Sequence, residues 1–103
     1  MKKKKSSLFT IRKKRKEKHP QIIVGADRTS FESVGLTHSK RSGKRSNIEL
    51  FINPDKNDNR KAYLKKQIIR DFKFLFSKAF KNYQLSDEDI EELKKFLDEK
   101  KKK

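Results

Sequence analysis

The sequence predicts a small α+β domain in which a curved sheet or barrel of three to five strands is followed by two helices. Short runs of β-branched and aromatic residues, separated by turn residues, occupy the chain up to residue 69, a pattern typical of strands. From Asp71 onward the apolar residues recur at helical spacing instead. Helices that follow a run of strands favour an α+β architecture in which they cover one end of the sheet.

The 103 residues leave room for one domain. We expect it to span residues 19–99, between a disordered basic arm at residues 1–18 and a basic tail at residues 100–103. The arm holds ten lysines and arginines, one glutamate and few apolar residues, so it cannot bury a core. It ends at His19-Pro20, because proline pushes the preceding residue out of helical geometry.

Strands are expected in four runs of the sequence. Residues 21–25 and 30–36 flank a turn sequence and are predicted to form a hairpin. Residues 47–52 place three aliphatic side chains on one face. Residues 61–69 could form a fourth strand or the entry to a helix, and a strand over residues 63–69 is favoured. Between these two runs, residues 53–59 are rich in Asn, Pro and Asp and are predicted to be a turn.

Two helices are expected after residue 70. The first spans residues 71–83, where six apolar side chains share one helical stripe: Phe72, Leu75, Phe76, Ala79, Phe80 and Tyr83. The second begins at Ser86, since Ser86 and Asp89 resemble a capping box in which Asp replaces Glu. Its acidic first turn suits the positive end of the helix dipole. Its buried face is predicted to consist of Ile90, Leu93 and Leu97.

The chain carries a net charge of +16, which predicts a polyanionic partner. The excess of cations lies in the arm and in residues 19–84, whereas residues 85–103 are close to neutral. Nucleic acid is the expected partner, because cations that bind its phosphates release condensed counterions. In the alternative interpretation the lysine-rich ends only keep the protein in solution. An anionic membrane fits less well, because the arm interleaves few aromatics or leucines with its charges.

The composition disfavours several other classes of function. The absence of cysteine excludes disulfides and cysteine-ligated zinc, and two histidines alone disfavour a histidine metal site. No apolar run approaches the roughly 20 residues that a membrane-spanning helix needs. Known phosphate-binding loops and paired catalytic carboxylates do not occur either. We therefore expect a cytoplasmic protein with no cofactor and no metal.

Thr37, His38 and His19 are the candidates for catalysis. Thr37 and His38 follow the second predicted strand, where a hydroxyl can bind a phosphate and an imidazole can move a proton near neutral pH. In the alternative, Thr37 only begins a turn and His38 is solvated. Pro20 fixes the backbone beside His19, which is otherwise an ordinary residue at the boundary between arm and domain.

Eight cations are candidates for contacts with phosphates. Four belong to a Ser/Gly-rich loop whose small residues let a backbone come close to phosphate: Lys40, Arg41, Lys44 and Arg45. The other four belong to the arm: Arg12, Lys13, Lys14 and Arg15. Such contacts position a nucleic acid without reading its sequence. Exposed aromatic rings could also stack on bases, and the candidates are Tyr63, Phe74 and Tyr83.

Four short motifs follow one another in a characteristic order. They are His19-Pro20-Gln21-Ile22-Ile23-Val24, Gly35-Leu36-Thr37-His38-Ser39, Ala62-Tyr63-Leu64 and Leu85-Ser86-Asp87-Glu88-Asp89. In this order the chain resembles the MazF/PemK type of toxin endoribonuclease over about residues 18–98.

The resemblance implies an SH3-like barrel, usually dimeric, that cuts single-stranded RNA without a metal and has an acidic antitoxin as its partner. RNA is therefore favoured over DNA. Thr37 matches the family's catalytic Thr or Ser, whereas His19 stands where the family has arginine. Imidazole moves protons but lacks the permanent forked grip of guanidinium on phosphate. Two alternatives remain open: a non-catalytic nucleic-acid-binding accessory protein of a phage or mobile element, and a protein-interaction module whose helices dock a partner.

Overall fold

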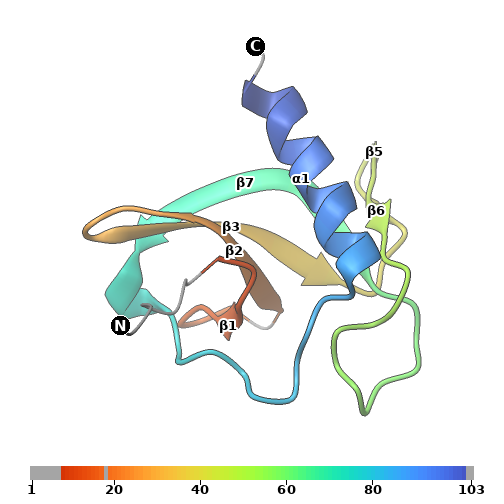
Figure 1. The fold of residues 1–103 in the computed structure, drawn as a ribbon, viewed down its shortest axis with the longest axis horizontal. Coiled ribbons are helices and arrows are strands. Elements are labelled where there is room, and N and C mark those ends of the chain that lie inside the picture. The colour runs from red at the N-terminus through yellow and green to blue at the C-terminus, as the bar shows by residue number, and fades with distance from the viewer. Residues whose placement is uncertain (1–7, 18, 102–103) are drawn as a thin grey trace, which may run out of the picture.

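The computed structural model describes residues 8–17 and 19–101, and Figure 1 shows how its elements are arranged. Five strands form one antiparallel sheet in the order β1-β2-β3-β7-β6. They are β1 (Ile11–Lys13), β2 (Pro20–Ala26), β3 (Ser30–Thr37), β6 (Ile48–Glu49) and β7 (Tyr63–Phe72). The other elements are the hairpin strands β4 (Arg41–Ser42) and β5 (Arg45–Ser46), the 3-10 turn η1 (Lys73–Leu75) and the helix α1 (Asp87–Lys101).

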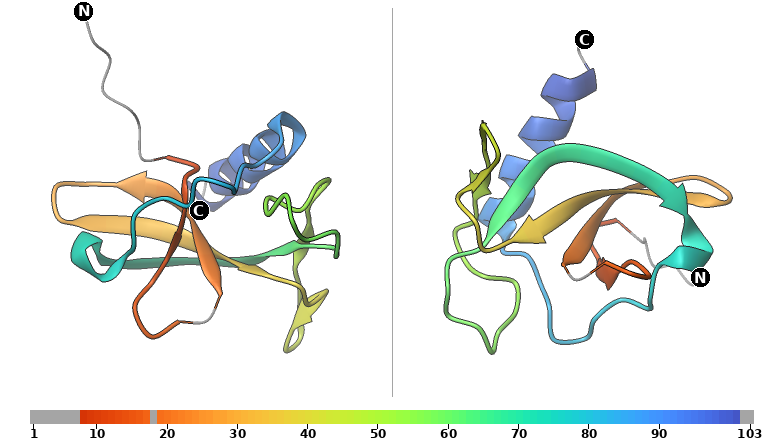
Figure 2. Two further views of the ribbon diagram at one scale, coloured as in Figure 1. Left: turned by 90° about the horizontal axis from the view of Figure 1, so that it is seen from below. Right: turned by 180° about the vertical axis from the view of Figure 1, so that it is seen from behind.

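Strand β3 lies at the centre of the sheet, between β2 and β7. Its Val34 sits opposite Ile22 of β2 and Ile68 of β7 and is fully buried. The hairpin of β2 and β3 forms where the sequence predicts it, because the Asp27 carboxylate accepts hydrogen bonds from two backbone N–H groups and closes the turn. Strand β7 is long and strongly curved, as Figure 2 shows.

The predicted first helix over residues 71–83 is wrong, and the described part of the chain has one α-helix instead of two. Strand β7 runs on to Phe72, which pairs with Ser30 of β3, and η1 takes the next three residues. The chain then follows the free edge of β1, where the N–H groups of Ser77 and Phe80 donate to β1 carbonyls at 2.8 Å. These pairings satisfy the backbone groups and override the helical spacing of the apolar residues.

Part of the predicted disordered arm is also a strand of the sheet. Ile11 of β1 lies opposite Ile22 of β2 and is only 1% exposed. One buried isoleucine directly before five consecutive cations does not produce a recognisable strand pattern in the sequence, so β1 was not predicted. The fold is thus a five-stranded antiparallel sheet, a two-stranded hairpin and one helix, not a barrel followed by two helices. Residues 1–7 and 18 of the predicted arm and 102–103 of the predicted tail lie outside the described residues.

Helix α1 closes one end of the core, where its Leu93 is fully buried. The Ser86 hydroxyl accepts the backbone N–H of Asp89 at 3.1 Å, as the capping box predicts. The Asp89 carboxylate, which is 2% exposed, accepts the backbone N–H groups of Phe51 and Ile52. This carboxylate therefore ties the chain that follows β6 to the start of α1 (Figure 1).

Candidate functional site

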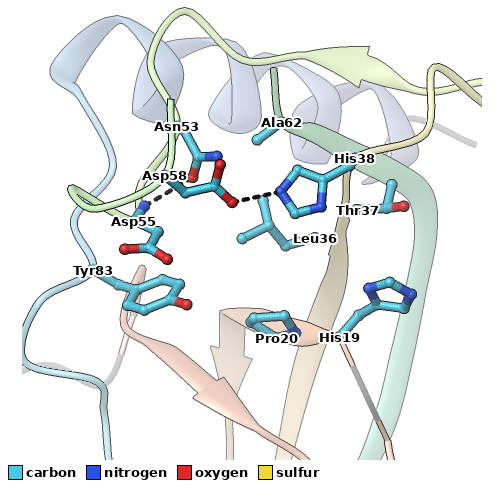
Figure 3. A pocket seen from close by; sticks show the side chains of 10 residues that line it. All are labelled: His19, Pro20, Leu36, Thr37, His38, Asn53, Asp55, Asp58, Ala62 and Tyr83. Atoms are coloured by element: carbon cyan, nitrogen blue, oxygen red, sulfur yellow. Dashed lines mark hydrogen bonds and ion pairs between the residues drawn. The ribbon is translucent and has the colours of Figure 1, made fainter. Parts of the chain in front are cut away.

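A small cavity lies where β2 begins and β3 ends (Figure 3). Antiparallel pairing sets Gln21 opposite Gly35, which brings the residues before β2 next to those at the end of β3. The cavity has a volume of about 60 Å³, enough for a few water molecules. His19, Thr37 and His38 all line it, so the structure brings together the three catalytic candidates that the sequence singles out.

A further wall of the cavity comes from the loop at residues 53–60. The Asn53 side chain braces this loop, because its amide nitrogen donates to the Arg60 carbonyl and its amide oxygen accepts the Asp55 N–H, both at 2.9 Å. The braced loop brings Asp55 and Asp58 to the cavity. The sequence predicts a turn here, but it does not predict that Asp58 contacts His38 and that Asp55 lies beside Tyr83.

Asp58 holds the imidazole of His38. Its Oδ2 lies 2.9 Å from Nε2 of His38 and 2.8 Å from an Arg60 guanidinium nitrogen, while its Oδ1 accepts two further N–H groups of Arg60 at 3.0 Å. These bonds, first those from Arg60 and then that from His38, hold the pKa of the Asp58 carboxyl well below its ordinary value. The ionised carboxylate places the proton of a neutral His38 on Nε2 and leaves Nδ1 as an acceptor. His38 is therefore held by Asp58 while its side chain stays 43% exposed.

Thr37 and His19 border the same cavity from different positions. Thr37 ends β3 and is 6% exposed, and its Oγ1 accepts the backbone N–H of Ser39 at 3.2 Å. This bond uses a lone pair of the Thr37 hydroxyl oxygen and not its proton. His19 precedes β2 and has an exposed side chain. A hydroxyl and two imidazoles therefore line one small cavity.

Tyr83 also lines the cavity, although the sequence suggests only a helix stripe or base stacking for it. Burial raises the pKa of the Tyr83 hydroxyl above its ordinary value, and a hydrogen bond with Asp55 adds to the shift. The hydroxyl thus stays protonated at neutral pH. Of the other two stacking candidates, Tyr63 is buried and Phe74 is 72% exposed.

The predicted basic loop is a tight hairpin made by β4 and β5. Gly43 takes a positive φ of 62° in its turn, which glycine adopts without strain. The Asn47 side chain pins the hairpin by donating to the Ser39 carbonyl at 2.9 Å and to the Ser42 hydroxyl at 3.0 Å. The cations it presents are all exposed, and none forms an ion pair among the described residues: Lys40, Arg41, Lys44 and Arg45.

The hairpin cations continue onto β7. A groove of about 350 Å³ runs between the hairpin and this strand. Four cations line it: Lys44, Arg45, Lys65 and Lys66. We call the hairpin and this groove the hairpin face. The hairpin face begins at Lys40, two residues after His38 in the chain.

The four arm cations do not form one surface with the hairpin. Arg12 packs over the Phe31 ring at 5.0 Å and donates to the Ser77 carbonyl, and burial lowers the pKa of its guanidinium. Lys14 pairs with Asp71 at 2.8 Å. The two remaining candidates, Lys13 and Arg15, are exposed. These residues lie near η1, at the other end of β7 from the hairpin (Figure 1).

Across residues 8–17 and 19–101 no group of three or more His, Asp or Glu side chains is placed to hold a metal ion. None of the helices in these ranges has the length and apolar character needed to cross a bilayer. Comparisons with protein-family models, with curated proteins and with solved structures give no match.

Proposed function

We propose that the protein binds RNA on its hairpin face and cleaves it, without a metal, in the cavity lined by His19, Thr37 and His38. One observation carries this proposal: a hydroxyl and an imidazole at the end of β3 border the same cavity as a second imidazole just before β2, and one of the imidazoles is oriented by a carboxylate. General acid–base catalysis needs such a pair of proton-moving groups near neutral pH.

The unpaired cations supply the binding part of the proposal. The hairpin face carries no neutralising carboxylate among the residues described, so its charges are free to attract phosphates. Asn47 pins the backbone that carries these charges, which lowers the entropy lost when RNA binds.

The chemistry follows from the groups around the cavity. His38, through the Nδ1 that Asp58 leaves free, takes the proton of a ribose 2′-hydroxyl while that oxygen attacks the adjacent phosphorus. Protonated His19 gives its proton to the 5′-oxygen as the bond between phosphorus and that oxygen breaks. The products are a 2′,3′-cyclic phosphate and a 5′-hydroxyl. The Thr37 hydroxyl donates to a non-bridging phosphate oxygen, where negative charge develops.

The two protein partners expected from the sequence, a second copy of the chain and an antitoxin, remain predictions. The MazF/PemK resemblance implies a homodimer and an acidic antitoxin partner, and it rests on the short sequence motifs alone. We also place the protein in the cytoplasm, because a chain without cysteine needs no oxidising compartment to fold.

Cleavage of a long mixed-sequence RNA in EDTA tests the proposed function. The wild-type chain should cut RNA and leave DNA of the same sequence intact, since DNA lacks the attacking hydroxyl. His19→Ala, His38→Ala and Thr37→Ala should each lose cleavage, with about 100-fold or greater loss for a histidine that moves a proton. Ser39→Ala is the matched control, because its exposed hydroxyl makes no side-chain hydrogen bond in the described structure.

The same assay separates the rival functions. RNA that is bound in a salt-dependent way but never cut identifies a non-catalytic accessory protein and overturns the catalytic part. Absence of any salt-dependent binding identifies a protein-interaction module and overturns the whole proposal.

A further inference from the structure

An exposed aromatic pair lies where β7 passes into η1. The rings of Phe72 and Phe74 are stacked, with centroids 5.5 Å apart and planes 10° apart. They are nevertheless 52% and 72% exposed, and neither belongs to the buried core. Large apolar surface that is left in water in this way marks a surface that another molecule covers.

Phe74 forms part of a groove of about 320 Å³ whose other side is basic. Its cations come from the end of β1 and the turn after it: Lys13, Lys14, Arg15 and Lys16. Only Lys14 has a carboxylate partner in the part of the chain that the structure describes, the 2.8 Å pair with Asp71. The groove therefore combines an uncovered ring with three unneutralised charges. We call it the aromatic groove.

Backbone hydrogen bonds hold the two sides of the aromatic groove together. The Arg15 N–H donates to the Leu75 carbonyl at 2.7 Å, and the Ser77 N–H donates to the Lys13 carbonyl at 2.8 Å. Phe72 supports one face of the Phe74 ring and so limits its rotation. A ligand therefore finds the backbone of both sides of the groove already in place, which reduces the entropy lost on binding.

We propose that the aromatic groove binds a single-stranded stretch of nucleic acid, with one unpaired base stacked against Phe74 and the flanking phosphates on Lys13, Arg15 and Lys16. The inference deepens the proposed function and rests on it. Base stacking on an exposed ring beside a cationic track is the usual chemistry of single-strand binding. A duplex fits poorly, because its bases are already stacked and paired.

A second copy of the chain is the less suitable occupant. Self-association through Phe74 would bring two basic grooves together, and their like charges would repel across an interface with few acids to compensate. In a nucleic acid, the phosphates supply the charge opposite to that of the groove, and the bases supply a flat surface that can cover the exposed Phe74 ring.

Two labelled 2′-O-methyl oligonucleotides of equal length test the inference by fluorescence anisotropy. One carries mixed bases and the other abasic sugars, and neither can be cleaved because the attacking hydroxyl is blocked. Phe74→Ala in the full chain should weaken binding of the base-bearing strand by about tenfold and leave binding of the abasic strand unchanged. Phe51→Ala is the matched control, because Phe51 is 70% exposed and lies outside the aromatic groove. Phe74→Tyr should restore tight binding, since it keeps the ring.

Three results would overturn the inference in distinguishable ways. If Phe74→Ala and Phe51→Ala bind the base-bearing strand with equal affinity, Phe74 does not stack on a base, and the proposed function is unaffected. Sedimentation that shows a wild-type dimer and a Phe74→Ala monomer assigns the ring to a second copy of the chain. A wild-type chain that binds neither strand at low salt removes the proposed function as well.

Discussion

His38 and Asp58 are twenty residues apart in the chain and 2.9 Å apart in the structure, from Nε2 to Oδ2. Their contact joins the end of β3 to a loop that the sequence identifies only as a turn. Arg60 binds the same carboxylate through its side chain and its backbone. The imidazole is thereby held in one orientation at the edge of the cavity.

Asp58→Asn should lower the rate of RNA cleavage by at least about tenfold. The amide keeps the shape of the carboxylate but cannot stabilise His38 in its protonated form after it takes the substrate proton. Because the substituted atom does not touch RNA, kcat should fall with little change in KM. Asp98→Asn, an equal change of charge on the exposed side of α1, should leave both constants unchanged. A fall in affinity with an unchanged kcat would contradict the positioning role.

Acid should destabilise the fold through carboxylates that are stabilised in their ionised form. The Lys14 ammonium, and next the Phe72 backbone N–H, hold the pKa of Asp71 below its ordinary value near 4. A carboxyl with a lowered pKa contributes stability that is present above its unfolded pKa and is lost as the pH falls through the folded value. Urea unfolding should therefore show a falling free energy of unfolding below about pH 4.

Lys14→Met should reduce that acid-induced loss, because it removes the largest cause of the Asp71 shift. Lys13→Met is the matched control, since Lys13 is exposed and forms no ion pair within the described ranges. The comparison is between the free energies of unfolding at pH 7 and pH 3. Identical pH dependence in the two variants would show that the Lys14–Asp71 pair does not contribute to stability.

Substitution of Lys44 and Arg45 together should weaken RNA binding and make it less sensitive to salt. Each lost contact between a cation and a single-strand phosphate should lower the slope of log affinity against log salt by about 0.7. Anisotropy titrations from low to moderate salt measure that slope. The control is Lys94→Ala with Lys95→Ala, which removes the same charge from α1, where both lysines pair with neighbouring glutamates. Equal slopes for the two double variants would remove the hairpin face from the binding surface.

Ile11→Ala should lower the free energy of unfolding by about 2–5 kcal/mol, because it leaves a cavity in the core beside Ile22. Ile52→Ala, at a side chain that is 53% exposed, should cost less than about 1 kcal/mol. Urea unfolding at neutral pH measures both. Equal, small costs would mean that residues 11–13 are not part of the folded sheet.

The sequence predicted the local features of the fold better than the long-range ones. The strands on either side of Asp27 and the cap at Ser86 were found because each depends on neighbouring residues. The helix predicted over residues 71–83 was wrong, because strand pairing with β3 and β1 decides that segment. Periodicity alone cannot show which edge of a sheet is free to accept a chain that returns to it.

In the candidate site, too, the sequence predicted local features better than long-range contacts. His19, Thr37 and His38 were singled out from their own chemistry, and the pairing of β2 and β3 places them around one cavity. The partner of His38, Asp58, was missed because a turn rich in Asn and Asp gives no sign of what it faces. The packing of Arg12 over the Phe31 ring was missed for a similar reason, since Phe31 lies on another strand.

The most direct test of the account is the chemistry of the product formed from a short RNA in EDTA. The account predicts that the wild-type chain yields a 2′,3′-cyclic phosphate and a 5′-hydroxyl end, detected by mass spectrometry, and that His38→Ala yields neither. Intact RNA, or products that carry a 5′-phosphate, would contradict it, because neither result is compatible with attack by the 2′-hydroxyl at the histidine cavity.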